Sequence, residues 1–237
     1  MYGSSIDEMV KMYSSRRAEL DREGVYFLRD INEDEAERFG KTMYLMGTER
    51  QGYKGRDINI YINSGGGSVG AGFAMMEMMF KVKRDFKVRV NTIVTGYAYS
   101  MGAIILQGGD WRRMGYFSSL MLHGGYWQVS GEDQKVFKDY GKLSDLYQGL
   151  IGDLFARRTG KHDAKWWQRY IYSGRDRFLS APECLELGLV DEICDYESCY
   201  INPSQLPKIE AAPKDGRKKT PMIPPVVIQP PTTSPTK

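Results

Sequence analysis

Only two histidines occur in this chain of 237 residues, His123 and His162, and they limit where acid–base catalysis could take place. A serine hydroxyl is a poor nucleophile at neutral pH, so it needs a general base, a group that orients this base, and N–H donors for the oxyanion. His123 ends an alternating strand and precedes two glycines, and strand ends are where α/β proteins gather their sites. A structural histidine is the simpler local interpretation of His123, whereas His162 lies in a polar turn and is expected at the surface.

Ser100 is the serine whose surroundings best suit a nucleophile. It follows an apolar strand, 88–94, through a turn of small residues and opens a helix that begins at Met101. Its hydroxyl would lie at a helix N-terminus, where outward N–H groups and the helix dipole favour developing negative charge. The N–H of Met101 is then a natural oxyanion donor. Judged locally, a simple helix cap is the more common role for such a serine.

Three consecutive glycines in the segment Ser64–Ser68 also connect a strand to a helix. They allow the backbone to approach another chain segment closely, so the loop could supply a second oxyanion N–H or pair with an extended peptide. Phosphate binding is the alternative, but the loop lacks the Lys-Ser/Thr of a P-loop and the spacing of a dinucleotide fingerprint. A fourth candidate, Asp176, stands between two arginines that could simply pair with it at the surface.

Composition excludes several classes of function. The net charge of +3 arises in segment 203–237, which has six basic and two acidic residues, so it does not indicate a nucleic-acid-binding face. No apolar run approaches the roughly 20 residues of a membrane helix, and the N-terminus lacks the apolar core of a signal peptide. We therefore predict a cytoplasmic protein without a membrane partner. Three cysteines without paired spacing predict free thiols and no metal site.

Strands that alternate with helices predict an α/β domain over residues 1–202. Nine of the ten prolines lie in residues 203–237, which predicts a disordered tail. The apolar periodicity predicts strands at 25–28, 57–63, 87–95 and 116–123, and helices at 5–22, 33–46, from 68 to about 82, from 100 onward, and 132–159.

The order and spacing of these segments resemble the Clp protease proteolytic subunit (ClpP) family. The resemblance runs in register from about Tyr13 to Ile193. The segments that carry it are INSGGGSV at 62–69, GYAYSMGA at 96–103, LH at 122–123, RDRFLSAPE at 175–183 and GLVD at 188–191. The serine and aspartate segments are the most specific of these.

The resemblance implies the site residues. Ser100 would be the nucleophile, His123 the general base and Asp176 the carboxylate that orients this base. The backbone N–H groups of Gly67 and Met101 would form the oxyanion hole. The reaction would be hydrolysis of peptide bonds through an acyl-enzyme.

The resemblance also implies a fold and an assembly. The fold would be a ClpP/crotonase-like spiral of β-α units, with helix 132–159 as the protruding handle. Subunits would form one or two heptameric rings that enclose the sites. This chain would hold no cofactor, and ATP would be used by a separate AAA+ unfoldase that delivers unfolded protein substrates. The missing P-loop agrees with that division of labour.

Several residues depart from the usual family pattern. Gly124 and Gly125 stand where Gln-Pro is usual, and Gly65 stands where proline is usual, so backbone near the site is looser. Gly174 replaces an acidic residue that helps to couple the rings, and the segment before Tyr13 looks helical where the family has an axial loop. These departures, with the long proline-rich tail, fit a divergent or phage-encoded member.

Three other functions remain to be weighed. A crotonase-type acyl-CoA enzyme would use the glycine-rich loop as an oxyanion hole for a thioester, but it would not need Ser100, His123 and Asp176 together. A catalytically silent scaffold subunit of a Clp ring would retain the fold without aligned residues. A relative of signal-peptide peptidases would use a serine–lysine dyad, and the order of motifs here favours histidine over lysine.

Overall fold

The computed structural model describes residues 15–16, 18–52, 56–125 and 134–194. Residues 18–23 are helical, in agreement with the C-terminal part of the helix predicted at 5–22. The start of that helix, the domain boundary at 202, the tail 203–237 and Cys199 lie outside the described residues. Cys184 and Cys194 form no disulfide within the described residues, in agreement with the predicted thiols, and both are buried.

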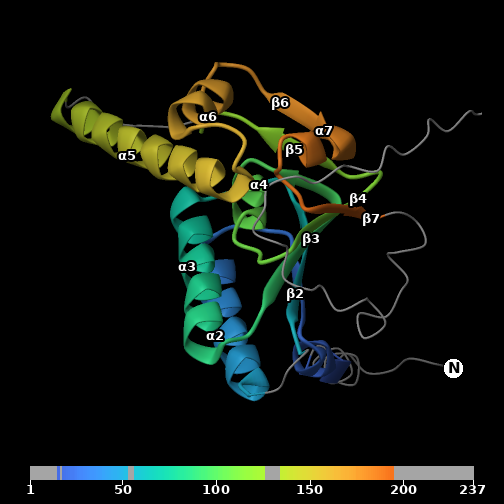
Figure 1. Cartoon of the computed structure of the whole chain (residues 1–237). Helices are drawn as coiled ribbons and strands as arrows, with labels where there is room; N and C mark the ends of the chain where they lie inside the picture. Colours follow the sequence, from blue (N-terminus) through green and yellow to red (C-terminus); the bar gives the residue numbers. More distant parts are fainter. Residues whose placement is uncertain (1–14, 17, 53–55, 126–133, 195–237) are drawn as a thin grey trace, which may run out of the picture.

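A sheet of seven strands, mostly parallel, organises the described residues (Figure 1). Its main path runs in the order β1-β2-β3-β4-β7, and β5 and β6 branch from β3. The strands are β1 (Val25–Leu28), β2 (Ile58–Ser64), β3 (Val90–Tyr99), β4 (Arg112–Gly115), β5 (Ser119–Leu122), β6 (Arg177–Ser180) and β7 (Glu192–Cys194). The central strand β3 pairs with β4 through its first half and with β5 through its second half. This split brings the end of β3, the end of β5 and the start of β6 to the same part of the sheet.

Helices α2 (Glu33–Arg50) and α3 (Val69–Phe86) lie side by side along the sheet (Figure 1). The side chain of Asn32 accepts a hydrogen bond from Glu35 N and so caps α2, as its position in the sequence predicted. Phe39, Met43 and Met79 are fully buried between these helices and the sheet. Removal of such side chains from water is the main stabilisation of the fold.

Helix α5 (Gln134–Thr159) protrudes from the rest of the described structure and confirms the predicted handle helix (Figure 1). Its C-terminal end packs on α6 (Ala164–Ile171), where Phe155 and Trp167 are both fully buried. The molecule is therefore an α/β fold with a protruding helix, as expected for the ClpP/crotonase type. No helix of the described segments is long and apolar enough to cross a membrane.

Several boundaries inferred from the sequence were wrong. Helix α2 ends at Arg50 and not at residue 46, and α3 ends at Phe86 and not at about residue 82. Strand β3 begins at Val90 and not at residue 87. Residues 96–99 are not a turn, because β3 continues to Tyr99 and pairs Tyr97, Ala98 and Tyr99 with β5. The strand predicted from residue 116 begins only at Ser119, after a short turn in which Ser118 N donates to Gly115 O. Strands β4, β6 and β7 and helices α6 and α7 (Ala181–Glu186) were not predicted.

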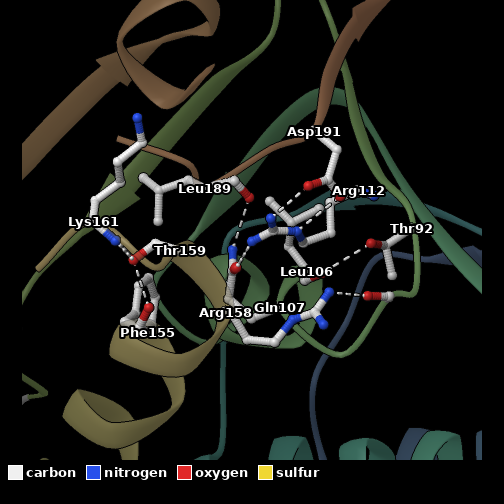
Figure 2. A network of polar contacts seen from close by, with 11 residues as sticks. Thr92, Leu106, Gln107, Arg112, Phe155, Arg158, Thr159, Lys161, Leu189 and Asp191 are labelled. Atoms are coloured by element: carbon white, nitrogen blue, oxygen red, sulfur yellow. Dashed lines mark hydrogen bonds and ion pairs between the residues drawn. The ribbon is translucent and has the colours of Figure 1, made fainter. Parts of the chain in front are cut away.

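The short helix α4 (Met101–Leu106) is held at its C-terminal end by a polar network (Figure 2). The side chain of Gln107 donates to Leu189 O at 3.1 Å and accepts from Arg112 at 2.5 Å. Arg112, which is almost fully buried, donates two side-chain hydrogen bonds to Asp191. Arg158 at the end of α5 donates to Gly109 O. Strand β4, the end of α5 and segment 189–191 thus converge on the C-terminal end of the helix whose N-cap is Ser100.

Candidate active site

Ser100 has a strained backbone, with φ 53° and ψ −120°. For a residue with a Cβ atom, a positive φ is unfavourable and persists only where surrounding contacts enforce it. Here Ser100 N donates to Met121 O at 2.8 Å, which ties the residue to β5. Although Ser100 is the N-cap residue of α4, its side chain makes no capping hydrogen bond. The structure therefore does not support the helix-cap interpretation of this serine.

The hydroxyl of Ser100 instead contacts His123. Ser100 Oγ lies 2.8 Å from His123 Nε2, which is hydrogen-bonding distance. His123 directly follows β5, and its side chain is only 14% exposed. A serine hydroxyl and an imidazole nitrogen in contact are the arrangement that a general base requires to take the hydroxyl proton.

Asp176 lies on the other side of the imidazole ring. Its Oδ1 is 3.7 Å from His123 Nδ1, longer than a hydrogen bond, and its side chain is 45% exposed. Catalytic hydrogen bonds are often long in free enzymes and tighten when substrate binds. Among the ion pairs of the described residues, none joins Asp176 to Arg175 or Arg177. The structure therefore brings Asp176 to His123 and not to its neighbouring arginines.

The glycine-rich loop lies directly against the serine. Gly66 has φ +102°, and a Cβ atom added to it would lie 2.8 Å from Ser100 Cβ and 3.2 Å from Met101 N. Gly67 has φ +150° and forms a bridge with Ile31, while the next residue, Ser68, donates its N–H to Ile31 O at 2.8 Å. The loop predicted to donate to the oxyanion is thus beside Ser100 and Met101. The N–H donors themselves, Gly67 and Met101, stay a prediction.

An apolar pocket opens beside Ser100 and His123. Its apolar wall comes from Val69, Met101, Ile104, Leu122, Ile151, Phe155, Ile171 and Tyr172. Burial of Tyr172 in this wall raises the pKa of its phenol to about 12. The polar lining of the pocket comes from Ser100, His123, Ser144 and Gln148. A concave, mostly apolar surface with a few polar groups is typical of a ligand pocket.

Sequence reasoning missed the residues that α5 and α6 bring to this pocket. Tyr172 is the clearest example, because it follows α6, which was not predicted. The one signal was the unusual Gly124, since a Cβ atom there would lie 3.0 Å from the Tyr172 ring. His162, predicted at the surface, is exposed and stacks on Trp166 with ring centroids 3.6 Å apart.

Comparison with known proteins agrees with this geometry. The family model for Clp protease matches residues 7–197. The ATP-dependent Clp protease proteolytic subunit of Oltmannsiellopsis viridis is 34% identical over an alignment of 178 residues that covers 73% of this chain and 85% of that protein. Proteolytic subunit 1 of Borreliella burgdorferi is 31% identical over 73% of this chain and 86% of that protein.

A third relative, the ATP-dependent Clp protease proteolytic subunit of Chlorella vulgaris, is 33% identical over 184 residues, with 73% of this chain and 83% of that protein covered. The family match spans β1 to β7 and includes Ser100, His123 and Asp176. The chain belongs to the Clp protease family of serine endopeptidases.

Proposed function

We propose that this chain is a serine endopeptidase with Ser100 as its nucleophile. The observation that carries the proposal is the 2.8 Å contact between Ser100 Oγ and His123 Nε2, made by a serine held in a strained backbone conformation. A strained residue that does not cap its helix calls for another role, and contact with a general base supplies one. Membership of the Clp protease family gives that chemistry its substrate class, the peptide bond.

The reaction would follow from the positions of these groups. His123 takes the hydroxyl proton as Ser100 Oγ attacks the peptide carbonyl, and the imidazolium then donates this proton to the leaving amine. Asp176 orients the imidazole and stabilises its charged form once its carboxylate has closed the present 3.7 Å gap. The N–H groups of Gly67 and Met101 would stabilise the oxyanion, and water would hydrolyse the acyl-enzyme.

The apolar pocket indicates which side chain the enzyme would accept next to the cleaved bond. Its walls come from α3, α4, β5, α5 and the C-terminal end of α6, and Ser100 and His123 line it as well. Removal of apolar substrate surface from water stabilises binding by roughly 25 cal/mol per Å². We expect peptides with a large apolar residue before the scissile bond to be cleaved faster than peptides with a charged one.

The proposal also covers the assembly of the subunits and the delivery of substrate to them. The relatives are named as proteolytic subunits of ATP-dependent proteases, so this chain would associate with copies of itself and with a separate AAA+ ATPase. One or two heptameric rings remain the expected form. The chain itself would need no cofactor, and a cytoplasmic location stays a prediction.

Labelling with a fluorophosphonate probe tests the chemistry directly. We expect one adduct per chain on Ser100, located by peptide mass spectrometry, because the probe reacts with activated serines. Labelling should be absent in Ser100→Ala and strongly reduced in His123→Ala. A folded and assembled wild type that is not labelled would instead support the scaffold function.

A further inference from the structure

The two arginines that flank Asp176 have different surroundings. Arg175 is exposed, whereas Arg177 is half-buried against α6. Arg177 Nε donates to the backbone oxygen of Tyr170 at 3.1 Å, and its guanidinium carbon lies 4.4 Å from the centre of the Tyr170 ring. A second guanidinium nitrogen donates to Ser173 Oγ at 3.3 Å. The side chain thus combines a stacked cation with a fork of hydrogen bonds, a geometry that lysine cannot reproduce.

Tyr170 is itself held in a column of stacked rings. Its ring stacks on Trp166 with centroids 4.7 Å apart, and Trp166 stacks on His162 at 3.6 Å. Both Trp166 and Tyr170 also contact the edge of Trp167, which is fully buried against Phe155 of α5. The Tyr170 ring, on which the guanidinium of Arg177 stacks, is therefore held in place by contacts with the core.

Strand pairing connects this anchor to the active site. β5 and β6 are antiparallel, and Arg177 lies directly opposite Leu122. His123 directly follows β5 and Asp176 directly precedes β6. The backbone at Arg177 therefore determines how far the carboxylate lies from the imidazole. The loop before Asp176 contains Gly174, where an added Cβ atom would meet nothing within 4 Å, although the φ of +75° favours glycine there. The contacts of Arg177 with Tyr170 and Ser173 thus fix the backbone directly after Asp176.

We infer that Arg177 is a positioning residue, which holds Asp176 within reach of His123 through its contacts with Tyr170 and Ser173. The inference rests on the proposed function and extends it to a residue that does not touch the reacting groups. The Nδ1–Oδ1 distance is 3.7 Å and must shorten to about 2.7–2.9 Å for a charge-assisted hydrogen bond. A backbone released at Arg177 would widen this gap, and a misplacement of about 1 Å can cost on the order of 100-fold in rate.

Hydrolysis of a small fluorogenic peptide by assembled protein provides the kinetic test. We expect Arg177→Gln and Arg177→Lys each to lower kcat by roughly 10- to 100-fold with little change in KM, because the base would be misoriented while the pocket stays intact. Arg169→Gln is the matched control: it removes the same charge from an exposed position of α6 and should change kcat less than about twofold. Full activity in Arg177→Lys would overturn the inference, since only the charge would then matter.

Two further comparisons separate positioning from general damage to the fold. In an Asp176→Asn background, Arg177→Gln should cost less than about threefold, because the carboxylate that it positions is already gone. An equal loss in both backgrounds would contradict the inference. Tyr170→Phe keeps the ring and the backbone acceptor and should remain close to wild type, whereas Tyr170→Leu should reproduce the loss seen in Arg177→Gln.

Histidine NMR tests the same idea without activity. In ¹⁵N-histidine-labelled protein only two imidazoles give signals, and His162→Gln assigns them. The signal of His123 Nδ1 should change in the same direction in Asp176→Asn and in Arg177→Gln, and it should be unchanged in Arg169→Gln. A wild-type spectrum identical to that of Asp176→Asn, or to that of Arg177→Gln, would overturn the inference even if peptidase activity is present. If the fluorophosphonate probe does not label Ser100 of the wild type, this result would instead refute the proposed function and not the positioning role of Arg177.

Discussion

At the scale of single residues, the candidate site depends on the contact of Ser100 Oγ with His123 Nε2 and on the close approach of Gly66 to Ser100. Ser100, His123 and Asp176 could be selected because the chain has only two histidines and because the motifs resemble a known family. Whether Ser100 caps its helix could not be decided from local sequence, since the alternative partner lies 23 residues away. The role of Gly66 was also hidden, because its restriction comes from a segment that folds against it and not from its neighbours in the chain.

Gly66→Ala should impair catalysis although it removes no polar group. A Cβ atom at this position would lie 2.8 Å from Ser100 Cβ and 3.0 Å from Tyr99 O, and the positive φ of +102° adds backbone strain. Either the loop or Ser100 must move, so we expect kcat/KM for a small peptide to fall by about 100-fold. Gly65→Ala is the matched control, because an added Cβ atom there meets nothing within 4 Å. Equal activity of the two variants would show that the loop does not need this close approach.

At the scale of elements, long periodic segments were predictable and short ones were not. The handle was expected at 132–159 and is observed at 134–159, because an amphipathic helix of this length has a clear apolar repeat. Strand β4 was not predicted, because two of the four residues in its sequence RRMG are charged. The sequence does not reveal that the charge of Arg112 is compensated by the distant Asp191. The predicted end of β3 at residue 95 was too early, because Gly96 suggests a turn. In the structure, pairing with β5 extends the strand to Tyr99.

The ion pair between Arg112 and Asp191 should make stability depend on pH. Burial opposes ionisation of Asp191, but the hydrogen bonds and charge of Arg112 outweigh it, so the pKa of Asp191 lies below its ordinary value. A carboxyl group with a lowered pKa in the folded state stabilises the protein above its unfolded-state pKa of about 3.9. This stabilisation is lost as the pH falls through the lower, folded-state pKa.

Asp191→Asn should therefore reduce the free energy of unfolding by about 2 kcal/mol at pH 7, since it leaves the buried guanidinium of Arg112 without its counter-ion. The difference from wild type should shrink as the pH is lowered below about 4. Thermal unfolding followed by circular dichroism between pH 3 and pH 7 measures both effects. Asp153→Asn, at an exposed position of α5, should change the melting temperature little at any pH. A constant difference at all pH values would contradict this explanation.

At the scale of the whole molecule, several large apolar side chains of the single chain are exposed to solvent. Phe27, Phe117 and Phe178 are 62%, 93% and 61% exposed, and Leu45 is 60% exposed. Single exposed apolar residues are normal on a protein surface. Several phenylalanines on β1, on β6 and before β5 are more simply explained if neighbouring subunits cover some of them.

We expect the purified protein to assemble into rings of seven or fourteen copies, as the family resemblance implies. Native mass spectrometry and sedimentation at decreasing concentration measure the number of copies directly, and a chain that remains monomeric at micromolar concentration would refute this expectation. Ser100→Ala should assemble like the wild type, because loss of one hydroxyl leaves the exposed surfaces unchanged. Gly174 adds a discriminating outcome: if its missing carboxylate weakens contact between rings, single rings of seven should predominate, and Gly174→Asp should increase the share of fourteen. Such a shift would place the loop before Asp176 at the contact between rings, next to the residue that orients the catalytic base.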